Sequence, residues 1–215
     1  MIGTFWRCSM TSNETAPARE TGAGRYNSGD DLLILIDFQN VYLPGQPWAC
    51  PTMEKAIENT LRIISAPGAP DYVLTQYLTP DAPVGRWKKY NEEYAEINAD
   101  PYLSELADPV RPAIRDGNVI VKDTYSSLKA PAMHARLAGK KRVVLTGVVA
   151  ECCVLSTMME AIDLGYEVIY LPDCVSGFTA ENEQMIRTLA ESFSPVHTQV
   201  MSSAEYIRLI SDPQR

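Results

Sequence analysis

The strongest constraint on the fold is a run of five apolar residues, Leu32 to Ile36, which is followed directly by Asp37. A run without alternation of apolar and polar residues is typical of a strand buried on both faces, as in a parallel sheet covered by helices. Comparable runs recur at residues 72–75, 119–122, 143–146 and 168–171, with a weaker one at 197–200. The sequence therefore predicts a central, mainly parallel sheet of about six strands.

Segments with a helical spacing of apolar residues separate these strands. They lie at residues 53–65, 84–97, 131–138, 151–164, 180–192 and 204–210. Strands that alternate with helices favour right-handed crossovers and a sheet with helices on both faces. We therefore predict a single α/β domain over residues 30–215, a three-layer α/β/α arrangement of Rossmann-like type. An insertion at about 79–117 is too long for a simple crossover and is expected to be functional.

Residues 1–29 are predicted to be a disordered or flexible leader. They are rich in Thr, Ser, Asn, Gly, Ala and Glu and hold no apolar segment of the kind a signal peptide requires. The five cysteines of the chain are odd in number and two of them are adjacent. That usage favours free thiols and a cytoplasmic location.

The charge of the chain excludes two classes of partner. Its 27 Asp and Glu residues outnumber its 19 Lys and Arg residues, which gives a net charge of -8. Nucleic acids and anionic membranes both require a basic surface, so neither is an expected partner. We expect the partner to be a small-molecule substrate.

Three reactive residues follow predicted strands. Asp37 comes directly after the first apolar run, Lys122 ends the third, and Cys153 lies in the turn after the fourth, where a helix is expected to begin. The carboxyl ends of parallel strands meet at the same edge of a sheet, where ligands bind. An acid, an amine and a thiol are therefore expected to lie close together, although each residue alone is more often a cap, a paired charge or a core residue.

This combination suits nucleophilic catalysis. A thiol near a helix N-terminus and a lysine loses its proton more easily than a free thiol. A nearby carboxylate can accept that proton and pass it to a leaving amine. The backbone N–H groups of the tight turn can stabilise an oxyanion.

Three segments resemble motifs of the isochorismatase-like cysteine hydrolases. Residues 37–42 are similar to their D-x-Q-N-x-F segment, residues 122–128 to K-x-x-x-S-x-F, and residues 147–154 to the nucleophile turn G-V-x-T-[DE]-x-C-V. The resemblance extends over residues 32–201, with the motifs in the same order. It implies the isochorismatase-like version of the predicted α/β fold.

The resemblance also implies roles for individual residues. Asp37 would accept and donate a proton, Lys122 would be its electrostatic partner, and Cys153 would be the nucleophile. A cis peptide between Val148 and Val149 would direct the N–H groups of Val149 and Cys153 toward the oxyanion.

Four residues are expected to bind the substrate: Gln39, Tyr42, Trp87 and Tyr125. Trp87 also shares a helical face with Tyr90 and Tyr94. This aromatic face is either a lid over an apolar part of the substrate or a packing surface, within the chain or between subunits. A homo-oligomer is expected, as a dimer or tetramer.

Among the departures from the family pattern, Ala150 replaces the usual Thr and Leu128 the usual Phe. Metal-dependent nicotinamidases of the superfamily need several histidines, whereas this chain has only His134 and His197. We therefore expect no metal and no cofactor.

The predicted function is hydrolysis of a non-peptide C–N bond, in an amide, ureido compound or lactam, through an acyl-enzyme on Cys153. Isochorismatase-type vinyl-ether hydrolysis is one alternative, although the isochorismatases proper usually lack the nucleophilic cysteine. The other alternative is a small-molecule-binding α/β protein without catalysis.

Overall fold

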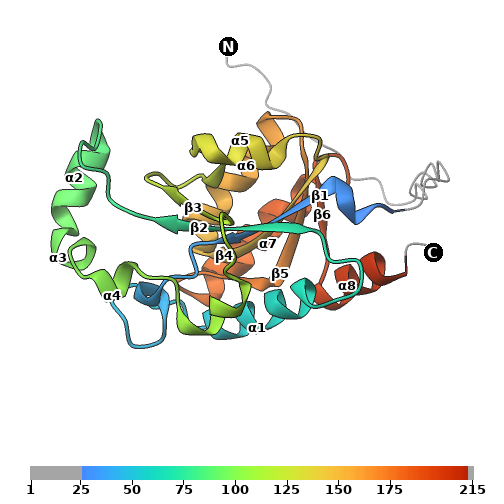
Figure 1. The fold of residues 1–215 in the computed structure, drawn as a ribbon, viewed down its shortest axis with the longest axis horizontal. Helices are drawn as coiled ribbons and strands as arrows, with labels where there is room; N and C mark the ends of the chain where they lie inside the picture. The colour runs from blue at the N-terminus through green and yellow to red at the C-terminus, as the bar shows by residue number, and fades with distance from the viewer. Residues whose placement is uncertain (1–25, 213–215) are drawn as a thin grey trace, which may run out of the picture.

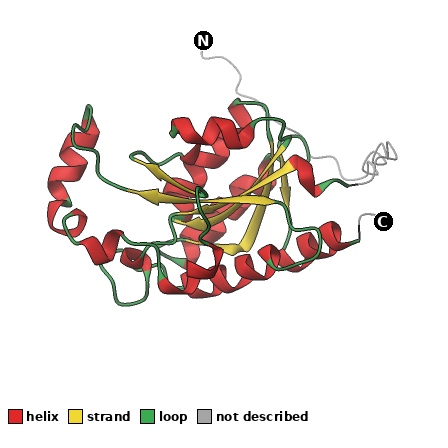
Figure 2. Cartoon of the chain, in the orientation of Figure 1, coloured by secondary structure: helices red, strands yellow, loops and turns green. Residues whose placement is uncertain are grey.

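Six strands form one parallel sheet in the computed structural model, which describes residues 26–212 (Figures 1 and 2). The order across the sheet is β3-β2-β1-β4-β5-β6, and every neighbouring pair is parallel. The strands are β1 (Asp31–Ile36), β2 (Asp71–Tyr77), β3 (Val119–Lys122), β4 (Arg142–Val148), β5 (Glu167–Ser176) and β6 (Thr198–Val200). The predicted fold class is confirmed.

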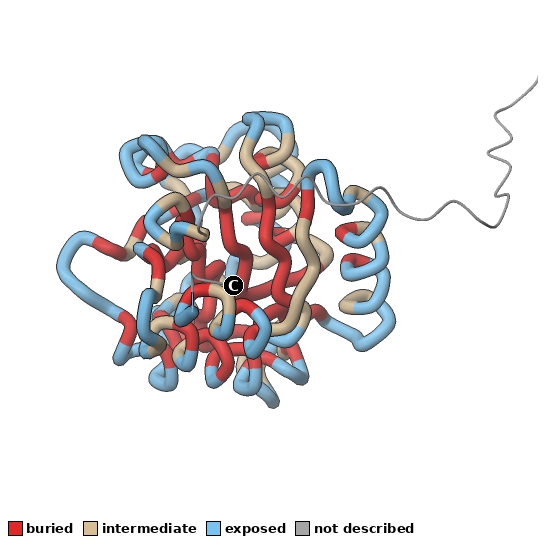
Figure 3. The backbone as a smooth tube through the Cα atoms, turned by 90° about the vertical axis from the view of Figure 1, so that its right-hand side faces the viewer, coloured by how far each residue is buried: buried red, intermediate tan, exposed pale blue. Residues whose placement is uncertain are grey.

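Helices cover both faces of the sheet. On one face lie α1 (Met53–Ile64) and α8 (Ser203–Ser211); on the other lie α5 (Pro131–Leu137), α6 (Leu155–Asp163) and α7 (Ala180–Ser192). Strand β1 shows why its sequence has no alternation. Leu33 and Leu35 pack toward α1 and α8, whereas Ile34 and Ile36 pack toward α5, α6 and α7. All of β1 is buried, and Figure 3 shows the strands as a buried centre between helices that expose their outer turns.

The insertion between β2 and β3 lies beyond the carboxyl end of β2 (Figure 1). It contains α2 (Arg86–Glu93), α3 (Ala95–Asn98), α4 (Pro101–Ser104) and a 3-10 segment at Asp108–Ala113. The prediction of one helix over 84–97 is wrong in this respect. The backbone leaves helical geometry at Tyr94, with φ -106° and ψ 24°, which separates α2 from α3.

Most of the predicted leader, residues 1–25, lies outside the described part of the chain, whereas its last residues, 26–29, contact the domain. The Tyr26 hydroxyl donates a hydrogen bond to Asp31, and the Arg142 guanidinium lies 4.3 Å from the centre of the Tyr26 ring. In the described range, no helix is long and apolar enough to cross a membrane. The cytoplasmic location stays a prediction.

Gly147 allows the two central strands to approach each other at their carboxyl ends. Its φ is 116°, and a Cβ atom there would overlap the backbone of Ile36. We expect Gly147→Ala to lower the free energy of unfolding by about 3–5 kcal/mol in urea denaturation, because both the strain and the overlap must be relieved. Gly139→Ala is the control, since Gly139 also has a positive φ but open space around it; it should cost only about 1–2 kcal/mol. Equal losses in the two variants would contradict the close approach.

Candidate active site

Asp37, Lys122 and Cys153 meet at the carboxyl edge of the sheet. Asp37 follows β1 with φ 51°, a conformation that Asp tolerates better than most residues. Lys122 is the last residue of β3, which is separated from β1 by β2, and Cys153 lies in a π-helical turn, Ala150–Val154, between β4 and α6. All three side chains are buried.

The distances join the three side chains into one cluster. Lys122 Nζ lies 2.7 Å from Asp37 Oδ2 and 3.5 Å from Cys153 Sγ. The same ammonium donates to the carbonyl oxygens of Thr124, at 2.8 Å, and Tyr125, at 3.0 Å. These carbonyl contacts fix the lysine head, so its position between the carboxylate and the thiol is well defined.

Thr75 orients the carboxylate and was not predicted as a site residue. Its hydroxyl donates to Asp37 Oδ1 at 2.7 Å, and its carbonyl accepts from the Asp37 N–H at 3.2 Å. Asp37 Oδ2 is left with the ion pair to Lys122 but no hydrogen bond of standard geometry within the described residues. That oxygen is therefore available for the thiol proton.

Opposing effects act on the pKa of the Cys153 thiol. Burial raises its pKa above the ordinary value, and the charge of Asp37 raises it further, whereas Lys122 opposes both effects only in part. For Lys122, burial favours the neutral amine, but the negative partners Asp37 and Cys153 outweigh it and the pKa is raised. The effect of Lys122 on the thiol has the direction predicted from the sequence, whereas burial and the charge of Asp37 oppose it.

The nucleophile turn has the backbone form that the resemblance implied, with a cis peptide between Val148 and Val149. The Val149 carbonyl accepts from the N–H groups of Cys152, at 3.0 Å, and Val154, at 3.1 Å. Thr157 binds the Cys153 carbonyl through its hydroxyl at 2.7 Å. These bonds hold the turn between the end of β4 and the start of α6.

Cys153 opens into a cavity of about 590 Å³. Six aromatic side chains contribute to its wall: Tyr42, Trp48, Tyr90, Tyr94, Tyr125 and Phe178. Val149 and Cys152 also border it, and no charged residue is among its lining residues. We call it the inner cavity.

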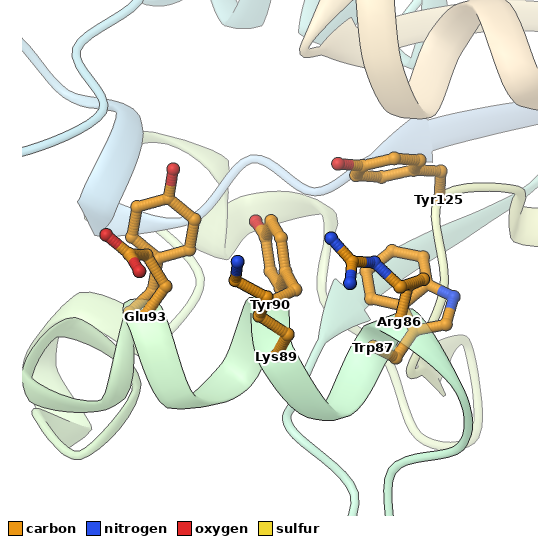
Figure 4. Close-up of a pocket in the computed structure, with 7 residues that line it drawn as sticks. Arg86, Trp87, Lys89, Tyr90, Glu93 and Tyr125 are labelled. Carbon is orange, nitrogen blue, oxygen red and sulfur yellow. The ribbon is translucent and has the colours of Figure 1, made fainter.

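A second cavity of about 480 Å³ lies between α2 and Tyr125 (Figure 4). We call it the outer cavity. Tyr90, Tyr94 and Tyr125 line both cavities, whereas Trp87 lines only the outer one. The outer cavity also has charged residues in its wall, namely Arg86, Lys89 and Glu93.

The predicted substrate-binding residues are only partly brought together. Tyr42 and Tyr125 border the inner cavity and Trp87 the outer one. Gln39 borders neither of these but lines a smaller cavity of about 240 Å³, which shares Tyr42 and Trp48 with the inner one, so its expected role stays a prediction. Its buried amide donates to the carbonyls of Tyr77 and Ser104 and accepts from the Tyr77 N–H. Gln39 therefore joins the end of β2 to α4.

The aromatic face of α2 packs against its own chain. The Trp87 ring lies 4.8 Å from that of Tyr125 and 6.4 Å from that of Tyr77, and the Tyr94 ring lies 5.3 Å from that of Trp48. The sequence left open a lid over the substrate or a packing surface. These contacts favour an aromatic wall that covers the site. The homo-oligomer stays a prediction, and the aromatic face of α2 does not support it.

Among residues 26–212, no group of three or more His, Cys, Asp or Glu side chains is placed to hold a metal ion. The four cysteines in that range, Cys50, Cys152, Cys153 and Cys174, have free thiols. Cys50 and Cys174 are buried in the core, whereas Cys152 borders the inner cavity.

The orienting role of Thr75 can be tested by substitution. Thr75→Val removes the hydroxyl that holds Asp37 Oδ1, and we expect kcat to fall by about 10–100-fold, because a hydrogen bond to a charged group is worth about 1.5–3 kcal/mol. Thr75→Ser should restore most of the rate. Thr146→Val is the matched control, since Thr146 is a buried threonine in β4 whose hydroxyl binds only the Ile34 carbonyl. Equal losses of activity in both valine variants would contradict a specific role for Thr75.

Comparison with known proteins agrees with the sequence motifs. An isochorismatase domain model matches residues 31–201. N-carbamoylsarcosine amidase from Arthrobacter sp is 31% identical over 171 residues, which cover 73% of this chain and 62% of that protein. The chain therefore belongs to the isochorismatase family. It spans less than two thirds of the length of that relative.

Solved structures share the fold at low sequence identity. A cysteine hydrolase from Pseudomonas syringae pv. phaseolicola 1448A superposes with a TM-score of 0.75 at 15% identity, over 88% of this chain and 96% of that one. N-carbamoylsarcosine amidase from Thermoplasma acidophilum gives a TM-score of 0.58 at 22% identity, over 80% and 96%. At these identities the likeness establishes the fold alone.

Proposed function

We propose that this protein is a cysteine-dependent hydrolase that cleaves a non-peptide C–N bond of a small molecule. The observation that carries the proposal is the contact of Lys122 with both Asp37 and Cys153 beside a cavity. Membership of the isochorismatase family and the similarity to an amidase support a reaction at a C–N bond.

The geometry suggests the order of proton transfers. As Cys153 Sγ attacks the carbonyl carbon, its proton passes to Asp37 Oδ2, the oxygen that lacks a hydrogen bond of standard geometry within the described residues. The positive charge of Lys122 stabilises the cluster while negative charge moves onto the substrate oxygen. The N–H groups of Val149 and Cys153 are the proposed donors to that oxygen.

The intermediate then collapses to products in two steps. The C–N bond breaks as Asp37 returns its proton to the leaving nitrogen, which leaves an acyl group on Cys153 as a thioester. Water next attacks the thioester carbonyl, and Asp37 accepts one water proton. The C–S bond breaks, the acid leaves, and the proton returns to the sulfur, so the enzyme is regenerated.

A substrate screen tests this function and separates it from the two alternatives. Ammonia or amine release is measured over amides, ureido acids, carbamoyl amines and lactams, and pyruvate release is measured with isochorismate as the vinyl-ether control. We expect turnover of at least one C–N compound and none of isochorismate. Cleavage of isochorismate alone would indicate vinyl-ether hydrolysis, and binding of these compounds without any turnover would indicate a non-catalytic protein.

A further inference from the structure

We propose that the substrate carries an anionic group remote from the scissile carbonyl, with an apolar or aromatic body between them, and that Arg86 and Lys89 bind this group. The inference rests on the proposed function and narrows it to a class of substrate. Its basis is that charged residues line the outer cavity but not the inner one.

The two cavities adjoin along a wall of tyrosines. Tyr90, Tyr94 and Tyr125 line both of them, and Cys153 lines only the inner one. Their volumes, about 590 and 480 Å³, each lie in the range of small-molecule sites. In this proposal, a substrate whose carbonyl lies at Cys153 passes between these rings into the outer cavity.

The inner cavity suits an uncharged group. None of its lining residues is charged, and half of them are aromatic. Burial of an unpaired charge in such surroundings is costly. The part of the substrate that follows the carbonyl is therefore apolar or aromatic.

The outer cavity suits an anion. Arg86 and Lys89 line it together with one carboxylate, Glu93. They lie three residues apart on α2, so they share a face of the helix. Figure 4 shows the Arg86 side chain extending into the space below Tyr125 and the Lys89 side chain beside Tyr90. Within the described residues, neither cation forms an ion pair with a protein carboxylate.

Two other substrate classes fit less well. A quaternary ammonium group would be attracted by the aromatic rings, but it would be repelled by Arg86 and Lys89. An α-ureido acid carries its carboxylate next to the reacting group, so that charge would lie in the uncharged inner cavity.

Three probes of equal length separate these classes. Each is a primary benzamide with a para propyl chain that ends in a carboxylate, in its methyl ester or in a trimethylammonium group. Ammonia release gives kcat/KM for each probe with the wild-type protein. We expect the carboxylate to exceed the ester by about 10-fold, which corresponds to about 1.4 kcal/mol, and the trimethylammonium probe to be the poorest.

Variants assign the preference to the two cations. Arg86→Gln and Lys89→Gln should each lower the carboxylate-to-ester ratio by about 3–10-fold, and the double variant should remove the preference. Lys88→Gln is the matched control, because Lys88 is exposed on the same helix but lines neither cavity. Its ratio should equal that of the wild type. Equal rates for carboxylate and ester in the wild type, or equal changes in all three single variants, would overturn the inference.

Binding provides a readout that does not depend on turnover. Trp48 and Trp87 line the inner and the outer cavity, so tryptophan fluorescence can report occupancy of both. If no probe is hydrolysed, the amide reaction fails, but tighter binding of the carboxylate probe that is lost in Arg86→Gln would still support the anion site. Equal dissociation constants for the carboxylate and the ester probe would overturn it.

Discussion

Replacement of Cys153 with alanine is expected to lower kcat/KM by about 10⁴-fold or more, because the nucleophile is lost. Cys153→Ser should be nearly as impaired, since a hydroxyl gives up its proton to Asp37 less readily than a thiol. The measurement is product release from the best compound of the substrate screen. Only one sulfur atom is removed from the buried turn, so the urea unfolding midpoint should change little.

Cys174→Ala is the control for loss of a buried thiol. Cys174 lies in β5 and borders neither cavity. This variant should retain wild-type kcat/KM. Retention of more than about a tenth of the activity in Cys153→Ala would contradict nucleophilic catalysis by this residue.

The second large effect is expected at Asp37. Asp37→Asn removes the proton acceptor, and general acid–base catalysis typically contributes about 10²–10⁴-fold to the rate. It also leaves the buried Lys122 ammonium without its counterion, which should lower the free energy of unfolding by about 3–5 kcal/mol. Steady-state kinetics and urea denaturation of the same preparation measure both effects.

A double variant separates catalysis from stability. Asp37→Asn combined with Lys122→Met removes both buried charges, and replacing a buried ion pair by groups of similar volume is often close to neutral. We expect the double variant to be more stable than Asp37→Asn alone but equally inactive. Recovery of activity together with stability would mean that Asp37 affects activity only by stabilising the folded protein.

The sequence was sufficient to predict where the reactive residues meet. Asp37, Lys122 and Cys153 each follow an apolar run, and the parallel topology brings the ends of those runs to one edge. Thr75 could have been inferred in part. It closes the apolar run next to β1 in the sheet, where a hydroxyl faces the residue that follows β1.

Other features depend on packing that no local pattern encodes. Trp48 and Phe178 belong to loops far apart in sequence, and they meet only in the wall of the inner cavity. Gln39 lies close to Asp37 in its motif, but its amide binds the carbonyls of Tyr77, at the end of β2, and of Ser104, which only the path of the insertion brings near. The effect of burial on the pKa of Cys153 is likewise a property of the folded chain, which the turn motif does not encode.

Detection of the acyl-enzyme is the most direct test of nucleophilic catalysis by Cys153. The p-nitrophenyl ester of the product acid is mixed with the protein, the reaction is quenched with acid, and intact mass and peptide mapping locate the adduct. The account predicts one acyl group per chain, on the peptide that holds Cys152 and Cys153, with fragmentation placing it on Cys153 and no adduct in Cys153→Ala. Hydrolysis of the ester without an adduct, or an acyl group on Cys152, would contradict the account.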